Sequence, residues 1–162
     1  MARPTVEELV ERLGLEPLPL EGGLFRETWK GDVRDGRPVG TAIVVLLATR
    51  GGHFSAMHRL PIDEVWFFQA GDPIELLLLA PGGPGRVAIL GPDVLDGHEL
   101  QVVVRAGTWM GARTAPGGEW SLFATTMAPG FVPTDYDPGD AAALVAAWPD
   151  HEPLIRALTR TG

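Results

Sequence analysis

The chain has 162 residues and a mass of 17.3 kDa, which fits a single domain over residues 1–162 with room for a full core. Its composition is 45% hydrophobic and 21% charged, unlike that of disordered chains. The net charge is −8, and the basic residues are scattered, so we expect neither nucleic acid nor an anionic membrane as a partner. Without cysteine the chain has no disulfide and no thiolate ligand or nucleophile.

The chain opens with MARPTVEELVERLGL, which carries charges where a signal peptide would be apolar. No later run approaches the roughly eighteen apolar residues of a membrane span, and we therefore expect a cytoplasmic protein. Thr5 and Glu8 have the spacing of a capping box, and apolar residues recur at helical spacing from Val6 to Leu13. This pattern predicts a short amphipathic helix that ends at Gly14.

From residue 40 onward the sequence consists of short apolar runs separated by Gly, Pro and Asp. The runs are TAIVVLLA, EVWFFQ, IELLLLA, RVAIL, LQVVV, TWMGAR and WSLFATTM. Their length and spacing predict an antiparallel sandwich or barrel of roughly eight to ten strands. Since TAIVVLLA is apolar on both faces, we expect it to be buried between two sheets, within one chain or across two subunits.

The C-terminal segment returns to a helical pattern. In DPGDAAALVAAWPD, Asp137 is the expected cap, Pro138 the first turn and Pro149 the end of a helix, and EPLIRALTR is a second short piece. The expected fold class is therefore mainly β, with short helices at both ends that cover an open face or edge of the sheets.

The stretch HRLPIDEVWFFQAG places His58 six residues before Glu64. In a strand over residues 64–69, Glu64, Trp66 and Phe68 share one face, so a carboxylate is aligned with two large aromatic side chains. Burial raises the pKa of such a carboxyl and a neighbouring cation lowers it, which is how active sites tune acids and bases. The alternatives are a solvated Glu64 at the start of its strand and a structural His58 in the core.

Residues 58–71, together with RAGTWM at 105–110 and APGF at 128–131, resemble the cupin superfamily. The first cupin motif ends with a histidine, then a glutamate after three or four intervening residues, and then a glycine after six more. Glu64 and Gly71 keep the last spacing, whereas five residues separate His58 from Glu64. Six blocks in the same order resemble, over nearly the whole chain, a group of small cupins known as a domain of unknown function (cupin-5-like). The resemblance implies a cupin-type jelly-roll barrel.

The resemblance also implies where a metal would bind, because metal-binding cupins use three His and one Glu. Ala56 stands where the first of these histidines would be, and Met110 where the histidine of the second motif would be. The ligand set is thus reduced to His58 and Glu64, and since metal catalysis needs about three protein ligands, we expect no metal or other cofactor. The remaining histidines fall in expected loops or at the C-terminal helix: His53, His98 and His151.

Cupins without a metal include sugar-nucleotide epimerases, which use a histidine base, an assisting carboxylate and a tyrosine acid. The resemblance then implies His58 as base and Glu64 as its orienting partner, with Arg26 or Arg113 stabilising an enolate. The single tyrosine, Tyr136, follows the last expected strand and has no predicted place in the barrel. The expected function is a metal-independent isomerase or epimerase that acts on a sugar or sugar-nucleotide-like metabolite.

Further residues are candidates for binding this ligand. Phe25 and Arg26 combine a stacking surface with a guanidinium, and Trp66, Trp109 and Met110 are candidate pocket walls. The alternatives are a surface strand for the first two and ordinary core for the others. The competing functions are a non-catalytic barrel that binds a small molecule and a scaffold that pairs as a homodimer.

Overall fold

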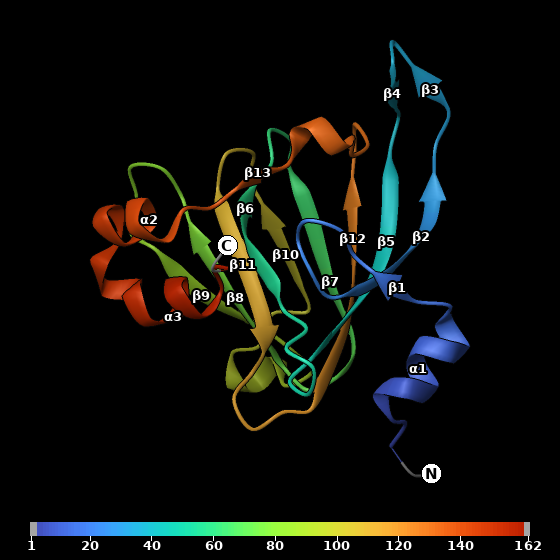
Figure 1. Ribbon diagram of the computed structural model, residues 1–162, viewed down its shortest axis with the longest axis horizontal. Coiled ribbons are helices and arrows are strands. Elements are labelled where there is room, and N and C mark those ends of the chain that lie inside the picture. Colours follow the sequence, from blue (N-terminus) through green and yellow to red (C-terminus); the bar gives the residue numbers. More distant parts are fainter. Residues whose placement is uncertain (1–2, 161–162) are drawn as a thin grey trace.

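The computed structural model describes residues 3–160, which form two antiparallel sheets packed against each other (Figure 1). In order across it, the six-stranded sheet contains β1 (Glu16–Pro17), β2 (Leu24–Lys30), β5 (Thr41–Ala48), β12 (Trp120–Met127), β7 (Glu64–Gly71) and β10 (Gln101–Val104). The five-stranded sheet contains β13 (Asp137–Pro138), β6 (Ser55–Arg59), β11 (Trp109–Thr114), β8 (Ile74–Leu79) and β9 (Arg86–Leu90). A hairpin of β3 (Val33–Arg34) and β4 (Arg37–Pro38) projects from β2 and β5.

The helices lie outside the two sheets. They are α1 (Val6–Leu13), α2 (Ala141–Ala147) and α3 (Glu152–Ala157), with the 3-10 turns η1 (Val94–Asp96), η2 (Pro133–Asp135) and η3 (Pro149–His151). Helices α2 and α3 cover the outer face of the five-stranded sheet, and α1 covers part of the outer face of the six-stranded sheet (Figure 1). Within residues 3–160, no helix has the length and apolar character needed to cross a membrane.

Strand β8 shows how a continuous apolar run fits this architecture. Leu76 and Leu78 point into the core between the sheets, whereas Leu77 and Leu79 pack against α2 and α3. Because successive side chains of a strand point to opposite faces, a strand that is covered on both sides needs apolar residues at every position.

Strand β5 is covered on both sides in the same way. Val45 and Leu47 belong to the core between the sheets, and Leu46 and Ala48 pack in the cluster under α1. One chain therefore accounts for both apolar faces of TAIVVLLA, and burial across two subunits is not needed to explain them.

The N-terminal helix confirms its prediction. The Thr5 hydroxyl accepts a hydrogen bond from the Glu8 amide at 3.2 Å, and the Glu8 carboxylate accepts one from the Thr5 amide at 2.8 Å. Gly14 ends the helix with φ at 63°, a left-handed conformation that glycine adopts without strain.

The predicted start of the C-terminal helix is wrong by three residues. Asp140 caps α2 by accepting a hydrogen bond from the Ala143 amide at 2.8 Å, whereas Asp137 and Pro138 form β13. Pairing of β13 with β6 places Pro138 opposite His58. The strand count differs too: of the thirteen strands described over residues 3–160, nine are longer than two residues, and the others are short pairings that a sequence pattern does not reveal.

Candidate functional site

A cavity of about 330 Å³ lies at the end of the barrel where β2, β5, β7 and β12 meet the segments around residues 20 and 133. Most of its wall is apolar: Leu18, Pro19, Leu20, Phe25, Ile43, Leu60, Met127, Phe131 and Pro133. Its polar residues are Glu21, Glu27, Lys30, Thr41, Glu64, Thr125 and Tyr136. Apolar walls with a few polar groups are typical of sites for small molecules.

Glu64 is the first residue of β7, and it points inward with Trp66 and Phe68 as the alternation of the strand predicts. Its side chain lines the cavity although the residue is only 7% exposed. The Trp66 indole donates a hydrogen bond to Oε2 of Glu64 at 2.8 Å, and this indole stacks on Phe123 with ring centroids 4.3 Å apart. The orientation of Glu64 is therefore fixed by the packed core.

Burial, together with the negative charge of Glu21, raises the pKa of Glu64 to about 7. His58 and the hydrogen bonds from Thr125 and Trp66 act in the opposite direction, because they favour the charged form. A carboxyl with this pKa exchanges protons readily near neutral pH, which is the property required of a general acid or base.

His58 lies on β6, in the other sheet, and is 1% exposed. Its Nδ1 lies 2.8 Å from the Ala56 carbonyl oxygen, and since a carbonyl can only accept, Nδ1 carries the hydrogen. Nε2 is 3.9 Å from Oε2 of Glu21, too far for a hydrogen bond. The ring is therefore oriented by a backbone carbonyl, and the carboxylate beside it is Glu21 rather than the predicted partner Glu64.

Glu21 was missed by the sequence analysis. It lies in the loop between β1 and β2, and its Oε1 accepts a hydrogen bond from the Ser55 hydroxyl at 2.6 Å. The Glu21 carbonyl accepts a second one from the Ala56 amide at 2.9 Å, so the loop is fastened to β6. Gly22 follows with φ at 100°, and a Cβ there would lie 2.6 Å from the Phe54 carbonyl oxygen. No local sequence pattern indicated this contact between the loop and β6.

Tyr136 is the second residue that the sequence analysis failed to place. Its ring stacks on His58 with centroids 5.1 Å apart and an interplanar angle of 19°. Burial, with the charge of Glu21, raises the pKa of its phenol to about 12, so Tyr136 stays protonated at neutral pH. Its hydroxyl forms no hydrogen bond with another residue of the described range, and Tyr136 lines the cavity.

The segment before Tyr136 is held by a partly buried ion pair. Arg37 donates to Oδ1 of Asp135 at 2.8 Å and to the Gly130 carbonyl at 2.9 Å. The Arg37 guanidinium keeps the pKa of Asp135 below its ordinary value. The β3–β4 hairpin thereby anchors the turn that carries Tyr136 over the barrel.

The comparisons with known proteins agree with this geometry. The family model described as Cupin superfamily (DUF985) matches residues 7–138. The chain belongs to this cupin family. A protein from Shewanella oneidensis is 30% identical, with a TM-score of 0.89 over 99% of this chain and 100% of that one. A hypothetical protein from Leishmania major is 29% identical, with a TM-score of 0.85 over 98% of this chain and 100% of that one.

A more distant cupin shares the fold alone. The cupin 2 domain-containing protein from Halorhodospira halophila is 16% identical, with a TM-score of 0.59 over 87% of this chain and 85% of that one. The predicted fold class, a mainly β cupin barrel with short terminal helices, is thus confirmed. A search of curated proteins found no match.

The donor set of this cupin does not fit the metal site that other cupins carry. Met110 lies directly opposite His58 across β6 and β11, and it is buried in the core where a second-motif histidine would stand. Ala56, also buried, occupies the other position. Within residues 3–160, no three His, Cys, Asp or Glu side chains gather in a way that could hold a metal ion. We therefore derive no chemistry through a metal.

The two predicted binding residues of β2, Phe25 and Arg26, lie on opposite faces of the strand. Phe25 lines the cavity, as expected for a ligand-binding wall. Arg26, the next residue along the strand, points to the opposite face and is exposed. Trp66 lies in the core and acts on the site through its hydrogen bond to Glu64.

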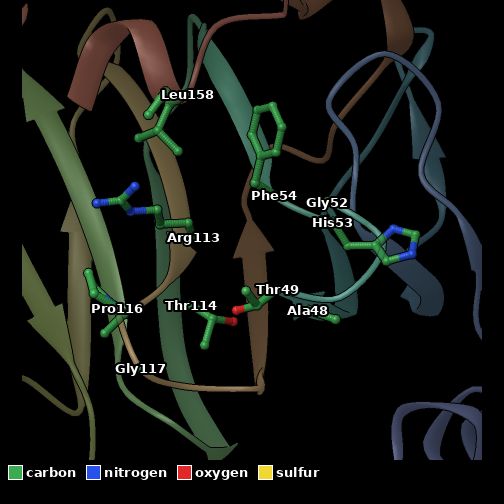
Figure 2. Close-up of a pocket in the computed structure, with 12 residues that line it drawn as sticks. Ala48, Thr49, Gly52, His53, Phe54, Arg113, Thr114, Pro116, Gly117 and Leu158 are labelled. Carbon is green, nitrogen blue, oxygen red and sulfur yellow. The ribbon is translucent and has the colours of Figure 1, made fainter. Parts of the chain in front are cut away.

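The predicted binding residues of β11 do not line this cavity. Trp109 packs in the cluster under α2 and α3, with the Arg59 guanidinium 4.5 Å from its ring centroid. Arg113 donates to Glu75 at 2.8 Å and faces a separate, open pocket beside Phe54 (Figure 2). Neither Arg26 nor Arg113 is thus placed to stabilise an enolate beside Glu64, which corrects that expectation.

Proposed function

We propose that this cupin is a metal-independent isomerase or epimerase that moves a proton at the carbon next to a carbonyl group of a small metabolite. The observation that carries the proposal is that Glu64, with a pKa of about 7, and Tyr136, with a pKa of about 12, line the same cavity. Two titratable groups whose environments give them such different pKa values can act as base and acid at one pH.

The proposed step begins with the ionised Glu64 carboxylate, which takes a proton from the carbon beside the carbonyl. The electron pair of the broken C–H bond forms a carbon–carbon double bond, and the carbonyl electron pair moves to its oxygen. The Tyr136 hydroxyl donates its proton to that oxygen. Glu64 then returns its proton to carbon, on the other face to give the epimer or on the adjacent carbon to give the isomer. The Tyr136 phenolate takes a proton back from an enol hydroxyl as the carbonyl re-forms, which restores both residues.

His58 acts in this proposal as a positioning residue. The ring does not line the cavity, and its contacts are with Tyr136 and Glu21, which do. Stacking fixes the plane of the Tyr136 phenol, and the imidazole lowers the pKa of Glu64. The geometry therefore supports Glu64, rather than the predicted His58, as the base that meets the substrate.

The size of the cavity favours a substrate of monosaccharide size. Its 330 Å³ hold about eleven water molecules at roughly 30 Å³ each. A sugar nucleotide would place most of its atoms outside this volume.

The test is proton exchange into small carbonyl compounds, namely hydroxyketones and aldoses, followed by proton NMR in D2O. We expect loss of the signal from the proton beside the carbonyl with the wild-type protein, and a rate lower by roughly a hundredfold or more in Glu64→Gln. Glu11→Gln on the exposed face of α1 is the matched control and should leave the rate unchanged. An unchanged rate in Glu64→Gln would reject the proposal.

A barrel that binds a ligand without turnover is the second candidate. The near-complete burial of His58 favours it, because a ring that meets no substrate cannot itself transfer a proton to one. This candidate predicts a melting temperature that rises with ligand concentration, with no exchange in the NMR experiment.

We also propose that the protein forms a homodimer. Strand β10 is an edge of the six-stranded sheet; Val103 on it is 44% exposed, and Leu100, just before it, is 55% exposed. The neighbouring turn η1 adds Leu95, which is fully exposed. Apolar side chains at a free sheet edge favour pairing with a second chain. Light scattering at micromolar concentration should give twice the monomer mass for the wild type and the monomer mass for Val103→Lys; a monomeric wild type would reject the pairing.

A further inference from the structure

Carboxylates outnumber cations among the described residues that line the cavity. Glu21, Glu27 and Glu64 line it, and the cation among the lining residues is Lys30. Glu27 and Lys30 are both exposed on β2 and carry opposite charges. Deeper in the cavity the two remaining carboxylates face no lining cation.

The arginines of the described chain that lie nearby do not line the cavity. Arg26 points to the outer face of β2, and Arg37 is occupied by Asp135. Arg160 stacks on the Phe54 ring, 4.8 Å from its centroid, and its guanidinium lies against Gly22. Its charge lowers the pKa of Tyr136, but Arg160 does not line the cavity. A phosphate or carboxylate group of a ligand would therefore enter a pocket whose described lining residues hold two inner carboxylates and no guanidinium.

Aromatic rings form part of the same wall. Phe25, Phe131 and Tyr136 line the cavity, and one face of the Tyr136 ring is stacked on His58. Aromatic faces attract organic cations, and the attraction strengthens where water is excluded. Carboxylates and aromatic rings together form the kind of surface that recognises an ammonium group.

Two buried polar side chains, Glu64 in the cavity wall and His58 against Tyr136, form no hydrogen bond with a cationic side chain of the described range. Glu64, 7% exposed, receives hydrogen bonds from Trp66 and Thr125, and it accepts none from a charged donor of the described chain. His58, 1% exposed, directs Nε2 at Glu21 across 3.9 Å without a hydrogen bond. An ammonium group between the two carboxylates would supply the missing positive charge.

We infer that this cavity selects a small organic cation, a molecule bearing an ammonium group, over neutral and anionic molecules of the same shape. The inference rests on the site of the proposed function and narrows its substrate class. Amine-bearing carbonyl compounds of the size of an amino sugar combine the ammonium group with the carbonyl that the proton transfer requires. It also replaces the sugar-nucleotide expectation, because a pyrophosphate has no cationic partner among the lining residues except the exposed Lys30.

Three probes of nearly the same shape test the inference: choline, 3,3-dimethylbutan-1-ol and 3,3-dimethylbutanoate, which carry a positive, no and a negative charge. Binding to the full chain is measured by calorimetry at pH 8, where Glu64 is mostly ionised, and at low salt. We expect the Kd of choline to be lower than that of the alcohol by roughly tenfold or more, and the acid to bind most weakly. Equal affinities, a preference for the acid, or no binding of choline up to tens of millimolar would overturn the inference.

Matched variants locate the selection within the cavity. Glu21→Gln keeps an oxygen for the Ser55 hydroxyl but removes the charge, and we expect choline affinity to fall by roughly fivefold or more while alcohol affinity stays the same. Glu7→Gln, exposed on α1, removes the same charge elsewhere and should change neither value. Glu64→Gln provides the second test, should Glu21→Gln lower the melting temperature. Two results would contradict the assignment of the selection to the cavity carboxylates. One is an equal loss of choline affinity in Glu7→Gln, and the other is an unchanged choline affinity in both Glu21→Gln and Glu64→Gln.

The binding experiment separates this inference from the proposed function. One outcome is selective choline binding without proton exchange into any carbonyl compound, including amine-bearing ones. It would reject the proposed proton transfer and support the cation site. Exchange into neutral carbonyl compounds, with no preference for choline over the alcohol, would keep the proton transfer and reject the cation site.

Discussion

Tyr136 lies nearly parallel to His58, with 5.1 Å between the ring centroids, although the two residues are 78 positions apart. The contact exists because β13, which begins one residue after Tyr136, pairs with β6 and sets Pro138 opposite His58. A two-residue strand therefore carries the only tyrosine of the chain into the barrel. The phenol and the imidazole then form one unit beside the cavity.

The first prediction separates the hydroxyl of Tyr136 from its ring. Tyr136→Phe keeps the stacking on His58 and removes the proposed proton donor, so we expect the NMR exchange rate to fall by roughly a hundredfold. The melting temperature should stay within about 2 °C of the wild type, because the hydroxyl has no described protein partner. A variant as active as the wild type would remove Tyr136 from the mechanism.

The second prediction concerns the pH dependence of stability. The pKa of Glu64 is about 7 in the folded protein and near its ordinary value of 4.5 in the unfolded chain. Between these values the folded state binds a proton that the unfolded state has lost, so the contribution of Glu64 to stability falls as the pH rises through this window. The total is on the order of 3 kcal/mol.

Glu64→Gln removes this titration. We expect its free energy of unfolding, relative to the wild type, to increase by about 3 kcal/mol between pH 4.5 and pH 8, as measured by urea denaturation. Glu11→Gln, exposed on α1, should show no comparable change over the same range. A difference between Glu64→Gln and the wild type that does not vary with pH would show that the carboxyl is not held neutral in the fold.

Local patterns predicted the part of the site that comes from one strand. Alternation in EVWFFQ placed Glu64 on the same face as Trp66 and Phe68. This inference holds because it depends on neighbours in sequence. The family and the barrel were predicted for the same reason, since turn residues and short apolar runs are local signals.

The partners of Glu64 were not predictable in this way. Glu21 and Tyr136 reach the cavity through a loop fastened to Ser55 and through the pairing of β13 with β6. Each contact joins segments more than thirty residues apart, and a single sequence carries no signal for such pairings. The prediction that Arg26 binds the ligand failed for a different, local reason. Phe25 and Arg26 were treated as one binding pair, although adjacent residues of a strand face opposite sides of the sheet.

The third prediction tests how Glu21 is held. Ser55 is fully buried, and its hydroxyl donates to Oε1 of Glu21 at 2.6 Å. Ser55→Ala leaves the carboxylate without this donor, and we expect a loss of stability of about 1 to 2 kcal/mol. Choline affinity should fall by roughly threefold as the loop loosens. Calorimetry and thermal melts measure both effects, and a choline affinity equal to that of the wild type would show that Ser55 does not position Glu21.

The fourth prediction gives a physical reason for the glycine at the end of the cupin spacing. Gly71 has φ at 91°, and a Cβ at this position would lie 2.5 Å from both the Trp120 ring and the Trp120 carbonyl oxygen. Backbone oxygen cannot move aside as a flexible side chain would, so β12 itself would have to shift. We expect Gly71→Ala to lower the free energy of unfolding by about 3 kcal/mol or more, measured by urea denaturation.

Gly82→Ala is the control, because Gly82 also has a positive φ, 74°, but no heavy atom lies within 4 Å of the added Cβ. We expect Gly82→Ala to lower the free energy of unfolding by only about 1 kcal/mol, which is the cost of the left-handed backbone conformation alone. The difference between the two variants isolates the close approach of β12 to the end of β7. Equal losses of unfolding free energy in both variants would mean that Gly71 is required only for its left-handed conformation. Trp120 and its backbone could then shift to accommodate the added Cβ.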